Sequence, residues 1–424
     1  MPEISKFRPL IAAWAALALP ACNVSAAAHA ASRGQDFARI QRGRYLAVAA
    51  DCNACHEDPY DGKPFAGGMA IETPFGSVLA PNITPDRDTG IGGWSEAQFE
   101  AAVRRGRRPD GKRLYPAMPF PYFVKMSPDD VAAIRAYLAT IEPVRHAVKA
   151  DQLPFPFSVR ASMLLWDALY FADAPFAPDP TKSAPWNRGA YLVQGPAHCG
   201  ACHTPKTALG GDKTASALQG YRIQGWFAPN LTNDRHNGLG DWSEADIVKY
   251  LETGHNRFDA ASGPMADEVK NSSSLMSPSD LSAMALYLKD QTGRATAAQR
   301  IDPKDPRMVA GGAIYDDLCA SCHKADGTGV PNLIPDLAAS AAVASPEPTT
   351  VIRVMLEGAN SVATKAEPTG PAMPTFGWQL TDAQIAAVGT YIRNSWTHAS
   401  PAVTERQVHE ARRMLAADRA AVGP

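Results

Sequence analysis

Three stretches of the chain share one pattern of apolar and polar positions. Each begins with serine or threonine, and apolar residues then recur at spacings of three and four until a tyrosine followed by leucine or isoleucine. The stretches run from Ser127 to Leu138, from Ser277 to Leu288 and from Thr381 to Ile392. A hydroxyl side chain caps the first turn of a helix, and the 3–4 spacing gives the helix one apolar face. The pattern therefore predicts three amphipathic helices that pack against a core.

A second helix is predicted upstream of each of these three, and each upstream helix contains glycine. The segments are Arg42-Gly43-Arg44-Tyr45-Leu46, Arg188-Gly189-Ala190-Tyr191-Leu192 and Gly311-Gly312-Ala313-Ile314-Tyr315. Glycine lets two backbones approach closely because it has no Cβ. We therefore expect aromatic residues of the terminal helix to pack against the glycine-containing helix.

Two further blocks recur between these helices in the first two units. The block Ala80-Pro81-Asn82-Ile83-Thr84 matches Ala228-Pro229-Asn230-Leu231-Thr232, and Gly93-Trp94-Ser95-Glu96-Ala97 matches Asp241-Trp242-Ser243-Glu244-Ala245. Similar blocks in the same order indicate a repeated structural unit. The third unit is shorter and more divergent, so the first two units are closer relatives of each other.

The repeats and the length of 424 residues together predict several separately packed units. We expect a signal peptide over 1–31, domains over 33–145, 183–293 and 305–398, a linker with an apolar helix over 146–182, and a charged tail over 399–424.

The N-terminus has the composition of an export signal. Lys6 and Arg8 precede the apolar run from Leu10 to Ala21, and small residues follow, with a cleavage site after Ala28-His29-Ala30. This order is typical of a secretory signal peptide, and the apolar run is too short to span a bilayer. In an alternative interpretation, Cys22 belongs to a lipoprotein signal and carries lipid. Either interpretation predicts an exported protein, soluble in the periplasm or attached to the periplasmic face of the inner membrane.

The overall charge argues against a nucleic-acid partner. Lys plus Arg is 41 and Asp plus Glu is 43, a formal net charge of −2. A nucleic-acid-binding chain usually carries a basic excess. The 45% of hydrophobic residues fits a globular protein, and seven cysteines are too few for a disulfide scaffold.

Six of the cysteines fall into one pattern that occurs three times. The motifs are Cys52-Asn53-Ala54-Cys55-His56, Cys199-Gly200-Ala201-Cys202-His203 and Cys319-Ala320-Ser321-Cys322-His323. C-x-x-C-H is the attachment signature of c-type haem: two thiols add to the two vinyl groups of one porphyrin, and the histidine binds the iron. A thioredoxin-like pair or a zinc site would not explain a histidine after every pair. The motifs predict three covalent haem c groups with His56, His203 and His323 as iron ligands.

A methionine in each unit is the candidate for the second axial ligand, which is commonly Met in cytochromes c. Met118 and Met265 each lie 62 residues after their motif histidine, and Met373 lies 50 residues after His323. All three are next to proline, and we expect them in loops before the terminal helix, where a rigid turn holds the sulfur over the iron.

The remaining candidates have less telling surroundings. Packing roles are expected for Met69, Met126, Met276, Met284 and Met355, and surface or structural roles for His146, His198, His236, His255, His398 and His409. Trp94 and Trp242 either donate to a haem propionate or fill the core at a helix start, and Asn82 and Asn230 have the same two alternatives.

The pair of helices around each motif resembles the brace of a class I cytochrome c, so the resemblance implies an all-α fold of three tandem class I cytochrome c domains joined by linkers. Along nearly all of its mature length the chain resembles the triple-haem cytochrome c subunit of bacterial membrane-associated dehydrogenases, such as alcohol and gluconate dehydrogenases. Besides the motifs, Tyr115-Pro116-Ala117-Met118-Pro119, Gly225-Trp226-Phe227-Ala228-Pro229-Asn230 and Tyr391-Ile392-Arg393-Asn394-Ser395-Trp396 carry the resemblance.

The resemblance implies an electron-transfer subunit without substrate chemistry of its own. Its partners would be a dehydrogenase catalytic subunit (quinoprotein, flavoprotein or molybdoenzyme), ubiquinone or a terminal oxidase or cytochrome as acceptor, and a membrane surface. His/Met ligation also leaves no iron position open for a substrate. Two alternatives stay open: a haem enzyme of the peroxidase or thiosulfate dehydrogenase type, and a free-standing soluble electron shuttle.

Two segments lie outside the haem motifs. The linker residues 153–171 predict a short apolar, aromatic helix that serves either as a docking or membrane-surface helix or as a clasp between domains. The tail from Glu405 to Leu415 predicts a charged amphipathic helix.

Overall fold

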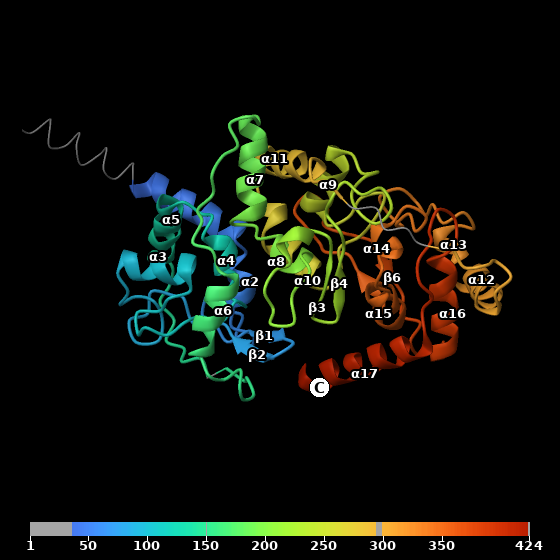
Figure 1. The fold of residues 1–424 in the computed structure, drawn as a ribbon, viewed down its shortest axis with the longest axis horizontal. Helices are drawn as coiled ribbons and strands as arrows, with labels where there is room; N and C mark the ends of the chain where they lie inside the picture. The colour runs from blue at the N-terminus through green and yellow to red at the C-terminus, as the bar shows by residue number, and fades with distance from the viewer. Residues whose placement is uncertain (1–35, 150, 294–298, 423–424) are drawn as a thin grey trace, which may run out of the picture.

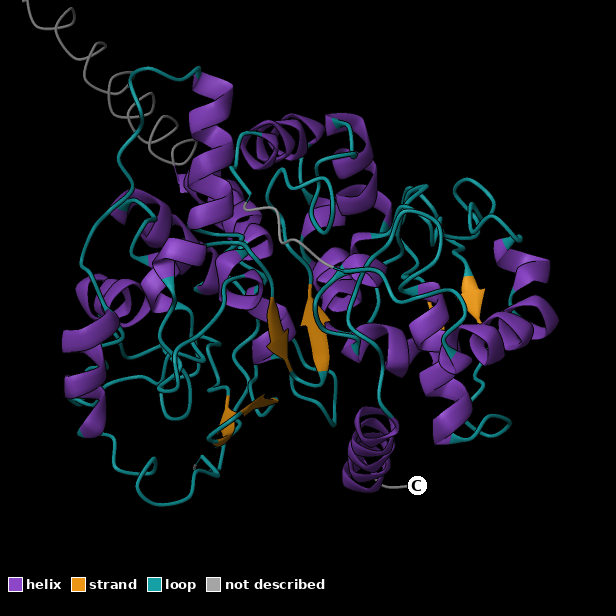
Figure 2. Ribbon diagram, turned by 45° about the vertical axis from the view of Figure 1, so that its right-hand side comes forward, coloured by secondary structure: helices purple, strands orange, loops and turns teal. Residues whose placement is uncertain are grey.

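The computed structural model describes residues 36–149, 151–293 and 299–422, so the predicted signal peptide and Cys22 lie outside the described residues. The chain forms three predominantly helical units that follow one another across the molecule, from the blue N-terminal part to the red C-terminal part (Figure 1). Figure 2 shows short strands in pairs between the helices. Within the described ranges, no helix is long and apolar enough to cross a membrane.

The elements of the first unit surround its C-x-x-C-H motif. They are a helix over residues 36–49, α2 (Cys52–His56), β1 (Ala70–Thr73), β2 (Gly76–Leu79), α3 (Glu96–Arg105), α4 (Phe120–Phe123) and α5 (Pro128–Leu138). The linker contains α6 (Ser162–Tyr170).

The second and third units repeat this order. The second has α7 (Ala184–Gln194), α8 (Gly200–His203), η1 (Thr214–Ser216), β3 (Tyr221–Ile223), β4 (Trp226–Ala228), α9 (Glu244–Thr253), α10 (Pro264–Asn271), η2 (Ser273–Leu275) and α11 (Pro278–Lys289). The third has α12 (Pro306–Leu318), α13 (Ala320–His323), α14 (Ala341–Ala344), α15 (Thr349–Glu357), β5 (Ala359–Asn360), β6 (Ala372–Met373) and α16 (Asp382–Ile392), followed by α17 (Glu405–Val422).

Three antiparallel hairpins, β1–β2, β3–β4 and β5–β6, qualify the all-α prediction. In β1–β2, Thr73 pairs with Gly76, so a tight turn joins the strands, and in β3–β4 Ile223 pairs with Trp226. Gly76 has φ +115°, which an L side chain adopts only with strain. Each of these two hairpins has at most four residues per strand, too few for alternating hydrophobicity to stand out in the sequence.

The terminal helices begin where the sequence pattern predicts. The side chains of Ser127, Ser277 and Thr381 each accept a hydrogen bond from a backbone N–H three residues later. These bonds satisfy one of the donors left free at a helix start. Each helix then contributes its apolar face to its own unit's core, which confirms the prediction from periodicity.

The glycine of each upstream helix lies directly on the backbone of the terminal helix. A Cβ built on Gly43 would be 1.8 Å from the carbonyl oxygen of Ala133. The corresponding distances are 1.9 Å from Gly189 to Ala283 and 2.2 Å from Gly311 to Ala387. The predicted aromatic packing is also present: Tyr287 and Tyr391 lie beside Gly189 and Gly311. The same close helix crossing is therefore present inside each of the three units, where it joins the upstream helix to the terminal helix.

The first two units meet through a reciprocal pair of contacts. Asp130 at the start of α5 accepts from Arg42 Nε of its own unit (2.5 Å) and from the hydroxyl of Tyr191 in the second unit. Asp280 at the start of α11 accepts from Arg188 Nε of its own unit (2.8 Å) and from the hydroxyl of Tyr45 in the first (2.6 Å). The repeated arginine, tyrosine and aspartate thus make equivalent bonds in both directions.

Removing one of these hydroxyls is expected to loosen the pair of units. Tyr45→Phe removes a partly buried hydrogen bond to a carboxylate, which contributes about 1.5 kcal/mol. We expect Tyr45→Phe to lower the denaturation midpoint, and the effects of Tyr45→Phe and Tyr191→Phe on the free energy of unfolding to add in the double variant. Tyr60→Phe is the control: the Tyr60 ring is 93% exposed, so its midpoint should stay unchanged. Equal midpoints for Tyr45→Phe and the unmodified protein would show that the contact does not hold the units together.

The same contact gives the expected pH dependence. Burial raises the pKa of Asp280, but hydrogen bonds from Arg188 and Tyr45 outweigh it and hold that pKa below its usual 3.8. A depressed carboxyl pKa contributes stability above the unfolded-state pKa and loses it as the pH falls through the folded value. Denaturation measured between pH 6 and 3 should therefore show the Tyr45→Phe penalty shrink below about pH 4.

The linker helix α6 has two different faces. Its inner face is a clasp: the Trp166 indole N–H donates to the carbonyl oxygen of Leu209 in the second unit (2.9 Å), and its ring contacts Phe120 of the first. Its outer face exposes Leu164, Leu165 and Leu169. The clasp hypothesis is therefore correct for one face.

The tail forms the predicted amphipathic helix, α17. Val408, Ala411 and Leu415 are buried against the third unit's core. Arg412 is bonded to Asp382 Oδ1 (2.6 Å) and to the carbonyl oxygens of Gly377 and Leu380. The tail is thus an integral part of the third unit.

Candidate haem sites

The three motif histidines share one arrangement. His56 Nδ1 lies 2.7 Å from the carbonyl oxygen of Pro81, His203 Nδ1 2.6 Å from that of Pro229, and His323 Nδ1 3.3 Å from that of Pro335. A carbonyl only accepts, so Nδ1 carries the proton in each ring. The other ring nitrogen, Nε2, is then a lone-pair donor, and the bond at Nδ1 fixes the ring's orientation.

Burial keeps these imidazoles neutral. It lowers the pKa of His56 and His323 and lowers that of His203 to about 4, against a smaller opposite effect of each proline carbonyl. A metal ligand must be the neutral form. At neutral pH all three rings are therefore ready to bind a metal.

The motif cysteines are free thiols on a single helical turn. Burial raises the pKa of Cys52 and Cys55 to about 12 and that of Cys319 to about 11, and it also raises that of Cys199. Before haem is attached, a thiol with a raised pKa is mostly protonated and therefore reacts slowly with oxidants. The third motif is the most open to solvent, because Cys322 is exposed and His323 only partly buried.

Each candidate methionine lies in the same apolar cluster as the first cysteine of its motif. Met118 and Cys52 both pack against the first unit's cluster, Met265 and Cys199 against the second's, and Met373 and Cys319 against the third's. Each candidate methionine therefore lies beside the same apolar cluster as an attachment cysteine of its own unit.

The loop prediction for these methionines is wrong in two of three cases. Met118 is in a loop, where its backbone N–H donates to Tyr115 (3.0 Å). Met265 instead lies in the first turn of α10, because Pro264 is well placed to start a helix, and Met373 lies in β6, paired with Ala359. The helix at Met265 has this local cause, whereas the strand at Met373 depends on its pairing with Ala359.

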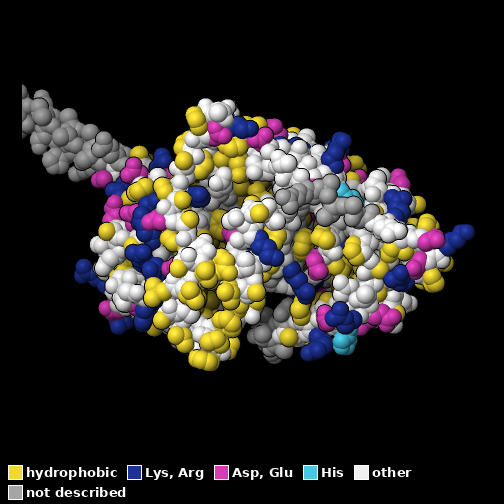
Figure 3. All heavy atoms as spheres, in the orientation of Figure 1, with side chains coloured by type: hydrophobic (Ala, Val, Ile, Leu, Met, Phe, Trp, Pro, Cys, Tyr) yellow, Lys and Arg dark blue, Asp and Glu magenta, His cyan; other side chains and the backbone are white. Residues whose placement is uncertain are grey.

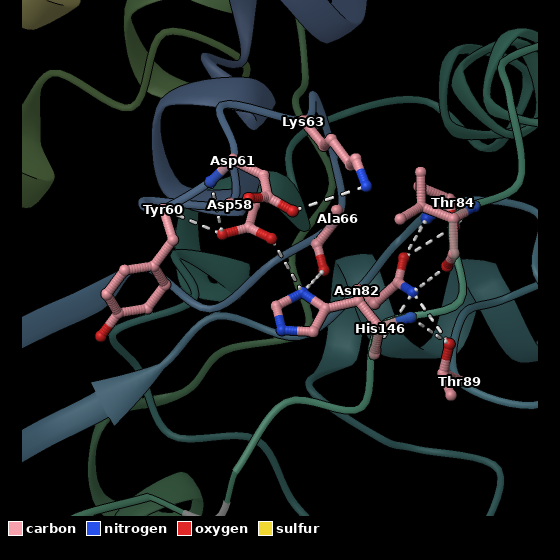
Figure 4. Close-up of polar contacts among 10 residues, drawn as sticks. Asp58, Tyr60, Asp61, Lys63, Ala66, Asn82, Thr84, Thr89 and His146 are labelled. Carbon is pink, nitrogen blue, oxygen red and sulfur yellow. Dashed lines mark hydrogen bonds and ion pairs between the residues drawn. The ribbon is translucent and has the colours of Figure 1, made fainter.

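Asn82 has a structural role in the first unit (Figure 4). Its amide nitrogen donates to the carbonyl oxygen of Val144 (2.7 Å) and to Thr89 Oγ1 (3.1 Å), and its amide oxygen accepts from Thr84. Asn230 makes the same bonds to Thr232, and its amide donates to Asn237. Both asparagines fix the loop that carries the proline carbonyl bound to the motif histidine.

Trp94 and Trp242 both pack in the core of their units, but they differ in burial. Trp94 packs in the first unit's core. Trp242 is buried and stacks on Phe258 with ring centroids 5.3 Å apart. Its indole Nε1 has no hydrogen-bond partner among the described residues. A haem propionate is an acceptor of the kind that this buried donor needs.

The other histidines have protein contacts of their own. These contacts are His146 Nδ1 to the carbonyl oxygen of Ala66 (3.1 Å, Figure 4), the His198 ring on Phe123, the His236 backbone N–H to Asp234 (2.7 Å), His255 Nε2 to Glu367 (2.8 Å), His398 Nε2 to the carbonyl oxygen of Leu337 (2.6 Å) and His409 Nδ1 to Asp382 (3.4 Å). The methionines expected to serve packing are also placed accordingly: Met126, Met276, Met284 and Met355 are buried and Met69 is partly buried.

Sequence reasoning missed the contact between the first and second sites. Tyr122 of α4, four residues after Met118, lies on the second motif: a Cβ on Gly200 would be 2.8 Å from the tyrosine ring. The Tyr122 hydroxyl bonds to Asp212, and α10 of the second unit contacts α2 of the first. The glycine inside the second motif was the available signal, since the other two motifs have larger residues there.

Two partly buried acids, Asp51 and Glu268, lie at the same boundary. Burial and the neighbouring Glu268 raise the pKa of Asp51 to about 9, and burial raises that of Glu268 to about 7. Ser273 Oγ donates to Glu268 (2.9 Å).

The donor set fits haem c. Each site has two free thiols on one turn, an imidazole with an available Nε2 four residues after the first thiol, and a thioether in the same cluster. Haem c needs these groups in this combination.

Comparison with known proteins gives the same result. The family model described as "Cytochrome c" matches three times, over residues 40–142, 187–292 and 308–396. The chain is 39% identical to the gluconate 2-dehydrogenase cytochrome c subunit of Pantoea cypripedii, over 94% of each chain. It is 36% identical to the fructose dehydrogenase cytochrome subunit of Gluconobacter japonicus, over 88% of this chain and 82% of that one. It is 37% identical to the quinone alcohol dehydrogenase cytochrome c subunit of Gluconobacter oxydans, over 91% and 84%.

The three matches to the family model and the alignments over most of each relative's length identify the family of this chain. The chain is an electron-transferring cytochrome with covalently bound haem c, and it belongs to the family of dehydrogenase cytochrome c subunits.

Proposed function

We propose that the protein relays electrons from the catalytic subunit of a periplasmic dehydrogenase to ubiquinone or a terminal respiratory carrier. The catalytic subunit would be a quinoprotein, a flavoprotein or a molybdoenzyme. The observation that carries the proposal is the histidine arrangement found in all three units: Nδ1 is held by a proline carbonyl and Nε2 is left for iron. Relatives that align over most of this chain are named as dehydrogenase cytochrome subunits, which supports a dehydrogenase catalytic subunit as the partner.

We assign each haem to one motif and one methionine. The thioether bonds form at Cys52 and Cys55, at Cys199 and Cys202, and at Cys319 and Cys322; the axial pairs are His56 with Met118, His203 with Met265, and His323 with Met373. The units that hold them are class I cytochrome c domains over 33–145, 183–293 and 305–398, and the family matches lie inside these ranges.

Bound haem c supplies a one-electron iron couple at each site. The chain's own residues prepare that site. Pro81, Pro229 and Pro335 orient the three imidazoles and make them more basic. The surrounding apolar clusters exclude water, and a low local dielectric is one of the factors that set haem potentials. The chain's contribution to electron transfer is therefore a rigid site, in which the ligands and the surrounding side chains move little when the electron arrives or leaves.

Co-purification tests the partner. The native chain is extracted with mild detergent, and the chains that accompany it are identified by mass spectrometry. We expect a larger flavin-, quinone- or molybdenum-containing subunit, whose substrate then reduces the haems of the complex. A haem-loaded chain isolated alone, and not reduced by dehydrogenase substrates in a membrane extract, would favour the free-standing shuttle.

Tyr122 and Gly200 hold the first and second sites together, so enlarging Gly200 should separate them. A valine at 200 meets the Tyr122 ring, which cannot swing freely because its hydroxyl bonds to Asp212. We expect Gly200→Val to retain three haems but to slow electron equilibration between the first two severalfold, measured by flash photoreduction. The third haem is the internal control, and an unchanged equilibration rate would contradict the role of this contact.

A further inference from the structure

A group of apolar side chains is exposed on the outer side of the linker, over α6 and the loop before it. Figure 3 shows hydrophobic side chains gathered there. We define the linker surface as Phe155, Phe157, Val159, Leu164, Leu165 and Leu169, all exposed. Phe155 is 82% exposed and Leu165 65%. Soluble proteins rarely leave so many large apolar side chains together in water, so this surface marks an interaction site.

The linker surface is not needed for holding the first two units together. The clasp uses the opposite face of α6, where Trp166 is buried and bonded to Leu209. Tyr170 on the same inner side lies against Gly211, with 2.2 Å between its ring and a Cβ built there. Leu164, Leu165 and Leu169 face away from the second unit and are exposed, so they are free to bind a partner outside this chain.

The linker surface carries no unpaired charged side chain among the described residues. Between residues 154 and 172 the charged side chains are Arg160 and Asp167. Arg160 pairs with Asp151 and lies over the Tyr115 ring, 4.4 Å from its centroid. Asp167 pairs with Arg113 at 2.7 Å and is only 11% exposed. The segment therefore presents an uncharged face to the outside.

Hydrogen-bonding groups are also scarce on this face. The Ser162 hydroxyl, one of two serines in the segment, donates to the carbonyl oxygen of Val159 (2.7 Å). A typical interface between proteins carries about ten direct hydrogen bonds. A surface with so few free polar groups fits hydrocarbon better than another protein.

A cationic loop borders the linker surface. Arg113 joins the loop to α6 through Asp167, and Arg160 Nη1 donates to the carbonyl oxygen of Arg113 (2.8 Å). The loop that follows α3, residues 106–113, contains the four basic residues Arg107, Arg108, Lys112 and Arg113 against the single acid Asp110. Arg107 and Lys112 are exposed. An apolar helix face beside an excess of Lys and Arg is the pattern of a segment that lies in the interface of an anionic bilayer.

We propose that the linker surface inserts into the headgroup region of a bilayer containing anionic phospholipid and holds the first two units against the membrane. The phenylalanines and leucines enter the acyl boundary, and the exposed Arg107 and Lys112 of the loop over 106–113 meet the lipid phosphates. This inference deepens the proposed function, and it rests on the location at the periplasmic face of the inner membrane that the sequence predicts. It does not depend on the identity of the dehydrogenase.

Vesicle sedimentation of the haem-loaded full chain tests the proposal. The vesicles contain phosphatidylethanolamine and phosphatidylglycerol in a 3:1 ratio, or phosphatidylcholine alone as the uncharged comparison. The test variant is Leu165→Glu with Leu169→Glu, two positions one helical turn apart. The matched control is Leu333→Glu, an exposed leucine in the third unit. Haem content and thermal midpoint are measured for each chain.

We expect the unmodified protein and Leu333→Glu to sediment with the anionic vesicles, and the double variant to partition about tenfold more weakly. Lys112→Gln should weaken binding to anionic vesicles alone. Equal sedimentation of the double variant and the unmodified chain, or no sedimentation of either, would overturn the proposal. So would a double variant that still binds vesicles but loses a co-purifying catalytic subunit, since the surface would then dock protein. None of these results alters the haem ligation or the electron relay, which are read from absorption spectra.

Discussion

Gly189→Ala is expected to disrupt the second unit. The new methyl group would lie 1.9 Å from the carbonyl oxygen of Ala283 and 2.5 Å from its carbon. Both atoms are helix backbone, so α7 and α11 must move apart, at a cost of about 3 kcal/mol, the upper end of the usual overpacking range. We expect a thermal midpoint several degrees lower and a reduced fraction of chains with haem at the second motif.

Gly93→Ala is the control for this change. Gly93 is exposed, its φ is not in the left-handed region, and the nearest atom to a built Cβ is the carbonyl oxygen of Arg87 at 3.8 Å. We expect its midpoint to match that of the unmodified protein. If Gly189→Ala were equally harmless, the close helix crossing would not be what holds the unit together.

Met265→Leu is expected to open one iron without unfolding the chain. Leucine conserves the volume of methionine, so the packing cost stays below about 1.5 kcal/mol. The thioether is lost, and with it the sixth ligand we assign to the second haem. Absorption spectra should show one of three haems in a high-spin form that binds carbon monoxide, and one of three reduction potentials should fall.

Met284→Leu is the matched control, because Met284 is a buried core methionine of the same unit. Its haem spectrum should be unchanged. A normal spectrum for Met265→Leu would exclude Met265 as ligand and return the other side chains of that pocket to consideration.

Local chemistry was predictable from the sequence, and long-range arrangement was not. The motifs, the capped terminal helices and the glycine crossings are encoded in short segments, and the structure has them where the spacing indicates. The local structures of Met265 and Met373 were mispredicted, because a helix started by Pro264 and a strand paired with Ala359 outweigh the turn tendency of proline.

The residues that make contacts between the first two units could be recognised in the sequence, but their partners could not. The arginine and tyrosine of the repeated segments and the aspartates at 130 and 280 all stand out in an internal alignment. That Tyr45 reaches Asp280 and Tyr191 reaches Asp130 depends on how the two units face each other, which periodicity does not encode. The apolar linker helix was equally ambiguous, since a clasp and a docking helix have the same composition.

A reductive titration with and without carbon monoxide tests the central claim most directly. The claim is that three haems, each closed by histidine and methionine, serve electron transfer alone. We predict that the haem-loaded chain takes up three electrons in one-electron steps, and that carbon monoxide leaves the reduced spectrum unchanged. A haem that binds carbon monoxide in the unmodified protein would contradict the account and favour a haem enzyme with an open iron site.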